Sequence, residues 1–454
     1  EMGIPAALVE QHLAELERVA GGVALLGEFS PRLRARVMAT GELMLTQLAA
    51  AWLPKAGIDA SLHDARDILV SRPGANEARH YLGAGCEHAR DPALDDRLGR
   101  GPAITQGFIA RDPAGHTVLL GRGGSDTSAA YFAARLGASR LEIWTDVAGM
   151  YTADPRVVPH ARLLRRLDYA EAQELAAMGA KVLHPRCIGP VRAAGIPLWI
   201  KSTPEPDLAG TVIEASGPGG ARVQALAART GIMLLSMESL GMWQEVGFLA
   251  RAFGVLERHG LSVDLVATSE SNVTVSLDAL ANALDPAVLD AAVAELREGC
   301  EVRVIGPCAA VSMVGHRIRA VLHEIGPALE AFAEHRIHMV SQAASDLNFT
   351  VVVDEDQASR LVLALHGRLL EAGASTDLGP AWREPEASWP RWWTARRDEL
   401  IQVATEGTPV YVHDLDVVRQ QVRKLDAVGV DRRFFAVKAC PVPEVLRTVV
   451  EEGL

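Results

Sequence analysis

The 454-residue sequence has few cysteines, no excess of basic residues and no long hydrophobic run. Its five cysteines are scattered without CxxC spacing, which argues against a disulfide framework and a zinc knuckle. Asp and Glu number 57 against 45 Lys and Arg, a formal net charge of −12, so nucleic acid is not an expected partner. The sequence contains neither a bilayer-length apolar run nor a signal-peptide pattern. We therefore expect no membrane partner and a cytoplasmic location.

The length of the chain exceeds one compact core, so two to four domains are expected. Residues 1–215 alternate apolar strands with helices, the pattern of a layered α/β domain. Strands are predicted at Ala60–Leu62, Ala103–Ala110, Thr117–Leu120, Leu141–Thr145 and Pro197–Lys201. Helices are predicted at Ala6–Val19, Pro31–Trp52, Asp126–Leu136 and Tyr169–Met178. The stretch SGPGG that follows is typical of a linker.

An internal repeat comes after this linker. The segments ERHGLSVDLVATSESNVTVSLD (Glu257–Asp278) and AEHRIHMVSQAASDLNFTVVVD (Ala333–Asp354) match at a constant offset, since 348 − 272 = 76 for their asparagines. The run NVTVSLD alternates apolar and polar residues as a half-buried strand does. Each copy has the pattern helix, strand, tight turn, strand. Two small α+β domains are therefore predicted, at residues 221–305 and 306–375.

A Pro- and Trp-rich connector, assigned to residues 376–407, separates the repeat from the last segment of the sequence. Residues 408–454 begin with a strand–helix pattern, and RFFAVKA is predicted as the next strand. This segment has 47 residues (454 − 408 + 1). That is about a fifth of the roughly 250 residues that an eight-stranded α/β barrel needs.

The stretch LLGRGGSDTSAAYFAARLGA predicts a ligand-binding loop between a strand and a helix. Three glycines surround Arg122, and the helix opens on Ser125 and Asp126. Glycines let backbone N–H groups approach a ligand, and a helix start favours an anion. The opposite charges of Arg122 and Asp126 suit a zwitterionic ligand as well as a salt bridge. The loop fits neither GxGxxG nor GxxxxGK[ST], and a plain tight turn stays open as an alternative.

Further polar residues lie where ligands bind in α/β proteins. Thr145 and Asp146 follow a strand, at the carboxyl edge of the predicted sheet. Tyr151 can cover a base or a ribose, and Arg156 can hold phosphates bidentately. A capped loop is the alternative for this stretch. Lys181 and Glu42 are two further candidates. The alternative for Lys181 is a counter-charge at the end of a helix, and the alternative for Glu42 is a solvated side chain.

Together, ATGELM, TQGFI, GRGGSDTSAA, WTDVAGMYTADPR and GAKVLHP resemble aspartokinase of the amino-acid kinase superfamily in order and spacing. The resemblance covers almost all of residues 1–215 and implies a three-layer αβα sandwich. It implies the first step of the aspartate/lysine pathway, phosphoryl transfer from Mg·ATP to the β-carboxylate of L-aspartate. The implied aspartate-binding residues are Glu42, Arg122 and Asp126. The implied nucleotide-binding residues are Thr145, Asp146, Tyr151, Arg156 and Lys181.

The chemistry agrees with this resemblance. A carboxylate nucleophile is ionised at pH 7, since its free pKa is about 3.9, so no general base is needed. Attack of an anion on a polyanion requires positive charge, which Mg²⁺, helix N-termini, Arg and Lys supply. The sequence does not identify metal ligands.

One segment of the family has no counterpart here. Aspartokinases open with a strand and a KFGGTS-type loop that holds the transferred phosphate, and the sequence starts beyond it. We expect a fragment, truncated at both ends, with little or no kinase activity of its own; normal ADP release with aspartate would contradict this. Two alternatives stay open: a catalytically inactive module that only binds a regulatory amino acid, and a kinase for another acceptor, such as glutamate or a carbamate.

The repeat resembles the paired ACT domains of aspartokinases, which have a ferredoxin-like α+β fold. The stretch SLGMWQEVGFLARAFGVLERHGLSVDLVATSE looks most like the lysine-sensing subclass. This implies L-lysine as effector, with threonine or no effector as alternatives, and a homodimer formed through the ACT domains. Backbone groups at the helix start suit a carboxylate, and Asp264 suits a cation. The implied effector contacts are Met242, Gly247, Phe248, Leu249, Asp264, Thr268 and Ser269.

The last segment resembles the start of diaminopimelate decarboxylase, a pyridoxal-phosphate enzyme with an α/β barrel. TPVYVHDLDVVR and FFAVKAC carry the resemblance, and Lys438 matches the lysine that forms the Schiff base with pyridoxal phosphate. Phe434, Ala436 and Lys438 share one strand face, so the amine can point into a barrel mouth. The family usually has Asn where this sequence has Cys440. The resemblance implies a bifunctional fusion of which only an incomplete barrel start, inactive by itself, is present.

Overall fold

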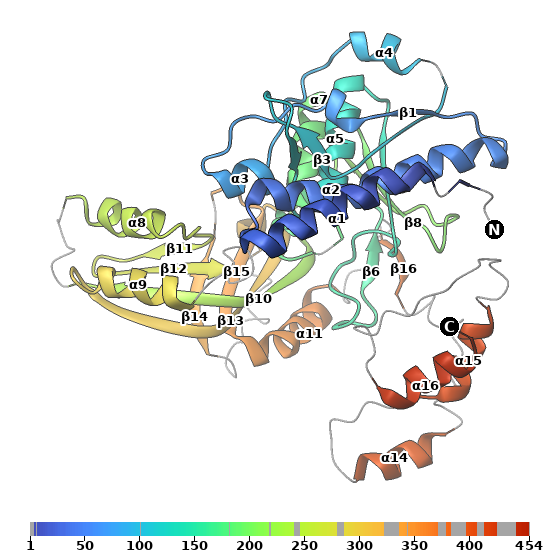
Figure 1. Cartoon of the computed structure of the whole chain (residues 1–454). Coiled ribbons are helices and arrows are strands. Elements are labelled where there is room, and N and C mark those ends of the chain that lie inside the picture. Colours follow the sequence, from blue (N-terminus) through green and yellow to red (C-terminus); the bar gives the residue numbers. More distant parts are fainter. Residues whose placement is uncertain are drawn as a thin grey trace.

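A computed structural model describes residues 4–5, 7–99, 101–180, 182–217, 219–239, 246–278, 286–321, 336–342, 344–370, 378–382, 396–405, 413–424 and 442–453. Helices and short strands form a first domain, and a large antiparallel sheet follows it (Figure 1). The mixed α/β organisation predicted for residues 1–215 is confirmed. Among the described residues, no helix combines the length and hydrophobicity that a membrane span requires.

Two long helices, α1 (Ala7–Leu26) and α2 (Pro31–Trp52), come first. Ser30 caps α2 through its side-chain oxygen, and a proline occupies the first turn, where a missing N–H leaves no partner unsatisfied. No residue of α1 is fully buried. The helix α2 packs closely, because Ala35 and Ala39 lie in an apolar cluster with residues of the neighbouring strands.

Short strand pairs and helices lie beside α2. Strand β1 pairs with β2 in parallel, and β3 pairs with β4 antiparallel. The strand predicted at Ala103–Ala110 is in fact two strands, because Phe108 has a left-handed backbone (φ 68°) and Gln106 turns into the interior. The bounds are β1 (Ser61–His63), β2 (Ala103–Thr105), β3 (Ile109–Arg111), β4 (Thr117–Leu119), α3 (Glu77–Leu82) and α4 (Ala93–Leu98).

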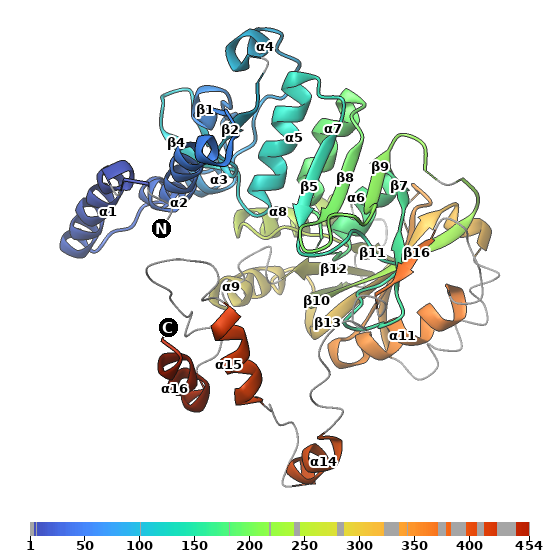
Figure 2. The ribbon, with the colours of Figure 1, turned by 90° about the vertical axis from the view of Figure 1, so that its right-hand side faces the viewer.

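A four-stranded sheet forms the centre of the first domain, in the order β5-β8-β9-β7. The pairs β5/β8 and β7/β9 are parallel, and β8/β9 is antiparallel. Helices α5 and α7 lie beside β5 and β8 (Figure 2), and with α6 they share an apolar core that contains Ile143, Leu175 and Ile200. The bounds are β5 (Leu141–Thr145), β7 (Arg166–Asp168), β8 (Leu198–Ser202), β9 (Thr211–Glu214), α5 (Gly124–Leu136), α6 (Tyr169–Ala177) and α7 (Ile188–Ala194).

The second half of the chain forms a six-stranded sheet in the order β11-β12-β10-β13-β15-β14. The repeat is confirmed, because the bounds of β12 and β15 differ by the same offset at both ends: 348 − 272 = 76 and 354 − 278 = 76. The first copy runs β10, α8, β11, β12, α9, β13, a ferredoxin-like order. The bounds are β10 (Arg222–Glu238), β11 (Val266–Thr268), β12 (Asn272–Asp278), β13 (Glu301–His316), β14 (Ile337–Ser341), β15 (Asn348–Asp354), α8 (Phe248–Arg258), α9 (Pro286–Leu296) and α11 (Ala358–Leu369).

The two copies share the long strands β10 and β13. Residues 232–238 of β10 pair with β12. Except for Met233, they also pair with the first half of β13, whereas Arg222–Arg229 pair with its second half. The register shifts around Gly231, whose backbone is left-handed (φ 73°). The start of β10 therefore completes the second copy. The boundary predicted between residues 305 and 306 does not separate the copies cleanly. It would assign Arg222–Arg229 to the first copy, although they pair with the second half of β13 in the second copy.

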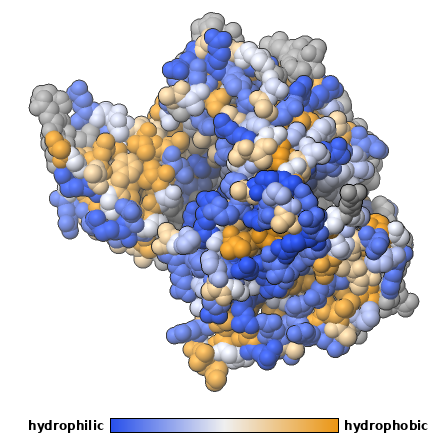
Figure 3. Space-filling view, turned by 90° about the horizontal axis from the view of Figure 1, so that it is seen from above, coloured by the Kyte–Doolittle hydropathy of each residue, from blue (hydrophilic) through white to orange (hydrophobic). Residues whose placement is uncertain are grey.

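Helices α8 and α9 cover the first copy, and α11 packs on the second. On the opposite side, Leu234, Cys308 and Val352 belong to another apolar cluster. The lobe that carries α8 projects at the left of Figure 1, and the view from above in Figure 3 shows hydrophobic residues gathered on it. Two exposed residues of this lobe are Val246 and Leu249.

After α11 the chain returns to the first domain. Strand β16 (Leu378–Ala381) pairs antiparallel with β6 (Arg162–Leu164), and the two strands lie side by side in Figure 1. Arg162 fixes β16 by donating from Nε to the Gly379 carbonyl at 3.0 Å. The sequence predicts a linker at 376–407, and the first described part of that range is thus a paired strand.

The remaining helices are α14 (Arg397–Thr405), α15 (Leu415–Lys424) and α16 (Pro443–Glu451). Helices α15 and α16 pack together through a small apolar cluster that includes Val422 and Val445. The predicted strand RFFAVKA, with Lys438, and the following Cys440 lie outside the described residues. The barrel start expected for this segment is therefore not shown.

Two leucines of α11 test the packing of the second copy. Leu361 is fully buried, whereas Leu363 is 45% exposed. We expect Leu361→Ala to lower the free energy of unfolding by about 2–5 kcal/mol, since it leaves a cavity. Leu363→Ala should change it by less than about 0.5 kcal/mol. Urea unfolding followed by circular dichroism measures both, and equal effects would contradict the described orientation of α11.

Candidate active site

The loop between β4 and α5 has a shape that favours glycine. Gly121 (φ 78°) and Gly123 (φ 63°) have left-handed backbones, and Gly123 directly precedes α5. A Cβ atom at Gly123 would lie 2.3 Å from the Cβ of His184, well inside van der Waals contact. The loop therefore packs directly on His184, and this contact depends on the glycine.

Arg186 holds the start of the same loop. Its Nη1 donates to the Leu120 carbonyl at 2.5 Å and its Nη2 donates to the Ala84 carbonyl at 2.6 Å. Charged donors make stronger hydrogen bonds than neutral ones, so Arg186 clamps two backbone segments together. Sequence reasoning missed Arg186 and His184. Their signal was the GAKVLHP stretch, which ends one residue before Arg186, but their roles depend on contacts with distant segments.

Arg122 and Asp126 both lie near His184. Burial raises the pKa of Asp126, opposed by a hydrogen bond from the backbone N–H of His184. Burial lowers the pKa of His184, and the charges of Arg186 and Arg122 lower it further. Within the described part of the chain, Arg122 and Asp126 form no salt bridge with each other, so the sequence alternative of a mutual ion pair is not realised. Arg122 is exposed and Asp126 is partly buried.

Glu42 lies on α2, in a turn of the helix that side-chain hydrogen bonds hold in place. Burial raises the pKa of Glu42. One turn later, the hydroxyl of Thr46 donates to the Glu42 carbonyl at 2.8 Å and accepts from Nε2 of Gln106, also at 2.8 Å. The Oε1 of Gln106 accepts from the Ala65 backbone N–H at 2.8 Å. The buried Gln106 thus fixes the turn of α2 that carries Glu42.

The TQGFI stretch, which is uninformative in the sequence by itself, packs on the first turn of α5. The backbone N–H of Phe108 donates to the hydroxyl of Ser128 at 3.2 Å. A Cβ at Gly107 would lie 3.1 Å from the Oγ of Ser125, and one at Gly124 would lie 2.5 Å from the ring of Phe108. This stretch therefore contacts both the turn of α2 that carries Glu42, through Gln106, and the start of α5, through Phe108.

Two of the expected nucleotide residues, Thr145 and Asp146, lie at the carboxyl end of β5. The Thr145 hydroxyl donates to Asp146 at 3.0 Å. Arg156 donates from Nε and Nη2 to the two carboxylate oxygens of Asp154, at 3.0 and 2.9 Å. This pair raises the pKa of Arg156, as does the charge of Asp146. A phosphate would have to compete with Asp154 for the guanidinium.

A lysine that sequence reasoning missed lies at the same edge of the sheet. Lys201 pairs across strands with Trp144, and its Nζ lies 4.8 Å from the centre of the indole ring, a cation–π contact. The next residues in the register are Thr145 and Ser202. Lys201 thus brings a positive charge to this edge. The expected Lys181 lies outside the described residues.

Tyr151 packs against the strand that returns from the second half of the chain. Its ring and that of Trp382 meet edge to face, with centres 5.4 Å apart. The Trp382 backbone N–H donates to the Ala161 carbonyl at 3.0 Å, which continues the β6/β16 pairing. Burial raises the pKa of Tyr151 to about 12.

The expected effector residues lie around the start of α8 and the loop after it. Gly247 (φ 90°) precedes the helix, Phe248 is buried and Leu249 is exposed. Asp264 pairs with Arg229 of β10, with a nitrogen–oxygen distance of 3.2 Å. Burial raises the pKa of Asp264, opposed by Arg229. The cation that Asp264 faces here is therefore a residue of the chain itself.

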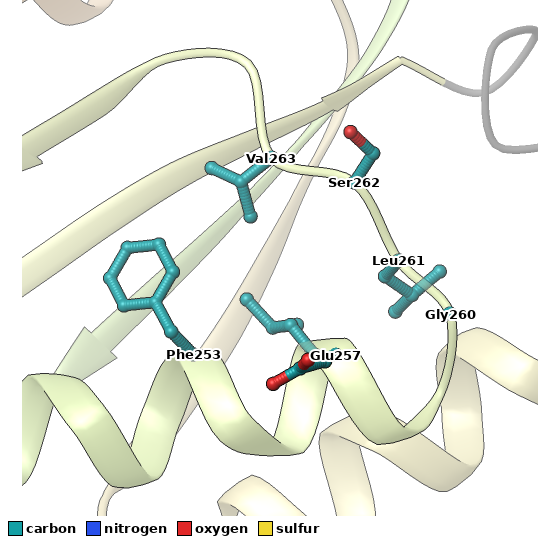
Figure 4. Close-up of a pocket in the computed structure, with 7 residues that line it drawn as sticks. Phe253, Glu257, Gly260, Leu261, Ser262 and Val263 are labelled. Carbon is teal, nitrogen blue, oxygen red and sulfur yellow. The ribbon is translucent and has the colours of Figure 1, made fainter. Parts of the chain in front are cut away.

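The tight turn after β11 has the predicted form. Thr268 ends the strand, and the Ser269 hydroxyl accepts from the Asn272 backbone N–H at 3.2 Å. Met242 lies outside the described residues. Near this region, a pocket of about 440 Å³ lies between the end of α8 and the following loop (Figure 4). It is lined by Phe253, Leu256, Glu257, Gly260, Leu261, Ser262 and Val263.

Comparison with known proteins identifies the family of the chain. The amino acid kinase family matches residues 6–202. The lysine-sensitive aspartokinase 3 of Escherichia coli (strain K12) is 37% identical over 367 residues, which are 79% of this chain and 81% of that protein. The chain belongs to the aspartokinase family.

Solved aspartokinase structures have the same fold. The crystal structure of E. coli aspartokinase III in complex with aspartate and ADP (R-state) has a TM-score of 0.71 at 35% identity and covers 80% of this chain and 81% of its own. The complex with lysine and aspartate (T-state) has a TM-score of 0.64 at 34% identity, with the same shares covered. The amino-acid kinase fold expected from the sequence motifs is thus confirmed.

The clamp formed by Arg186 can be tested directly. Arg186→Met removes two charge-assisted hydrogen bonds, each worth about 1.5–3 kcal/mol, and should increase hydrogen–deuterium exchange in residues 118–126. Arg192→Met, on the exposed side of α7, is the control and should leave that exchange unchanged. Unaltered protection of the loop in Arg186→Met would rule out the clamp.

Proposed function

We propose that the protein phosphorylates the β-carboxylate of L-aspartate with Mg·ATP as phosphoryl donor. The observation that carries this proposal is the glycine loop, on which Arg122 and Asp126 lie near His184 and, within the described residues, form no pair with each other. Opposite charges held close together but unpaired suit a zwitterionic amino acid. The aspartate and ADP bound to the E. coli relative support the same substrates here.

In the proposed reaction, Arg122 holds a carboxylate of aspartate, while Asp126 and Glu42 lie near its ammonium group. An oxygen of the ionised β-carboxylate forms a bond to the γ-phosphorus as the bond from phosphorus to ADP breaks. The products are aspartyl phosphate and ADP. No side chain needs to remove a proton, because the nucleophile is ionised at neutral pH. The task of the protein is to position two anions and offset their charge.

We assign nucleotide binding to Thr145, Asp146, Tyr151, Arg156 and Lys181, and we add Lys201. Lys201 supports this assignment because its ammonium group lies at the edge of the sheet beside Thr145. Arg156 takes part if the polyphosphate displaces Asp154 from its guanidinium. Mg²⁺ enters as part of the nucleotide substrate.

Arg122→Ala should weaken aspartate binding by at least about tenfold, since one charge-assisted pair is lost. Calorimetric titration with aspartate in the presence of Mg·ADP measures this. Arg140→Ala, at the other end of β5 and paired with Glu142, is the control and should bind as the wild type does. Equal affinities of both variants would exclude the assigned role of Arg122.

A coupled ADP-release assay with aspartate tests the kinase reaction itself. The expected result is ADP release by a chain that also carries the KFGGTS-type segment, and little or none by residues 1–454 alone. A second candidate is a module that binds a regulatory amino acid without catalysis, which the occupation of the Arg156 guanidinium by Asp154 favours. Titrations with lysine and with aspartate plus Mg·ATP separate the two. Binding of lysine alone favours the regulatory module. A higher rate of ADP release with glutamate than with aspartate would identify glutamate as the acceptor.

We propose that the two copies of the repeat are ACT domains, that they bind L-lysine, and that they form a homodimer. The ferredoxin-like order of the first copy and the name of the lysine-sensitive relative support this. The repeat offset gives a further argument, since 264 + 76 = 340 and the second copy has Val340 where the first has Asp264. At this position of the repeat, an amino group therefore finds a carboxylate only in the first copy.

Asp264→Asn should weaken lysine binding by about tenfold or more, because the amide cannot offset the ammonium charge. Asp290→Asn, exposed on α9, is the control and should retain wild-type affinity. Calorimetry with lysine and with threonine measures both variants. Tight threonine binding, or no binding of either amino acid by the wild type, would contradict lysine as the effector.

We also propose that residues 408–454 begin a diaminopimelate decarboxylase barrel, in which pyridoxal phosphate is attached to Lys438 in the complete protein. The packing of α15 on α16 supports this, because consecutive helices of an α/β barrel lie side by side. Lys438 itself lies outside the described residues, and the attachment of the cofactor to it therefore rests on the sequence motif alone.

A further inference from the structure

A capping box at the start of α6 leaves two carboxylate oxygens unused. The Oδ1 of Asp168 accepts from the backbone N–H groups of Ala170 and Glu171, at 2.7 and 2.8 Å. The Oε2 of Glu171 accepts from the Asp168 N–H at 3.0 Å. This reciprocal cap is complete with one oxygen from each side chain. The other two oxygens, Oδ2 of Asp168 and Oε1 of Glu171, take no part in the cap.

Both of these oxygens face His316, the last residue of β13. The Nε2 of His316 contacts the Oδ2 of Asp168 and lies 3.8 Å from the Oε1 of Glu171. The three atoms lie within 4.8 Å of one another. Glu171 is fully buried, and its Oε1 has no hydrogen-bond partner within the described residues. A buried carboxylate oxygen without a partner is costly, and such atoms in native structures often mark an absent ion or water.

We propose that Asp168, Glu171 and His316 bind a divalent first-row transition metal ion. One imidazole nitrogen and two carboxylate oxygens are a ligand set suited to Zn²⁺, Mn²⁺ or Co²⁺, with the remaining positions taken by water. The cap uses the other oxygen of each carboxylate, so metal binding does not compete with it. The site is independent of the phosphoryl-transfer residues and of the proposed effector site.

The position of this site gives the metal a structural role. Asp168 and Glu171 belong to the first domain, whereas His316 belongs to the six-stranded sheet. Other contacts cross the same boundary: Asn348 of β15 donates to Glu174 of α6, and Gln224 of β10 donates to the Arg166 carbonyl. A metal here would join the catalytic domain to the regulatory sheet by coordinate bonds. Its binding should therefore stabilise the docking of the two.

A second cluster provides an internal control. Cys308, His338 and Asp354 also bring three ligand atoms within 4.8 Å of one another. Here too the histidine contacts an aspartate, because His338 and Asp354 are hydrogen-bonded at 2.7 Å. Burial, together with Asp354 and Glu355, raises the pKa of the Cys308 thiol to about 11, which keeps it in the protonated form that metals bind poorly. As far as the structure describes the chain, this cluster lacks an unpartnered buried atom of the kind found in Glu171.

The test is a titration of the full chain, without an affinity tag, with Co²⁺ followed by its visible absorption. We expect one equivalent to bind without a thiolate-to-cobalt band. His316→Gln and Glu171→Gln should each weaken binding by at least about tenfold, whereas Cys308→Ser should bind as the wild type does. Zn²⁺ should raise the melting temperature of the wild type and leave that of His316→Gln unchanged.

Circular dichroism of the metal-free variants establishes that they are folded. If His316→Gln fails to fold, the nearly isosteric Glu171→Gln decides the question. The proposal is overturned if the wild type binds no Co²⁺, if binding survives in a folded ligand variant, or if Cys308→Ser abolishes it. Because these measurements use no nucleotide and no amino acid, their outcome is independent of whether the chain phosphorylates aspartate.

Discussion

The contact between Gly123 and His184 is the constraint on which the candidate active site depends. The absence of a side chain at Gly123 allows α5 to begin directly on His184, and the His184 backbone then donates to Asp126. Arg186, two residues further on, fixes the carbonyl of Leu120 just before the loop. One short segment thus sets the direction of the helix, the position of an acidic side chain and the end of a strand. Any larger residue at position 123 would disturb all three.

The six-stranded sheet depends on a different constraint, the continuity of β10 and β13. Each strand passes through both copies of the repeat, so the copies cannot move as independent bodies without bending a shared strand. Glycine at position 231 provides the left-handed backbone at which the register changes. The same strands bring the end of β13, with His316, to the cap of α6. The arrangement of the sheet therefore determines which residues meet the first domain.

The sequence predicts features that arise from local patterns. The glycine loop, the helix Pro31–Trp52 and the repeat are readable because their signals lie within one segment or recur at a fixed offset. The roles of His184, Arg186 and Lys201 are not readable, since each depends on a neighbour more than 50 residues away or on an adjacent strand. The strand expected at Ala103–Ala110 is interrupted for the same reason: Gln106 forms hydrogen bonds to α2 and Ala65, which no local pattern reveals.

The return of the chain to β6 through β16 limits how far the two halves of the molecule can separate. Only eight residue steps (378 − 370) connect the last described residue after α11 to β16, which Arg162 holds to the first domain. A fully stretched chain of that length reaches at most about 29 Å. This short connection limits how far the six-stranded sheet can move away from the first domain. The same return places Trp382 against Tyr151, so the chain passes the first domain there before it reaches α14.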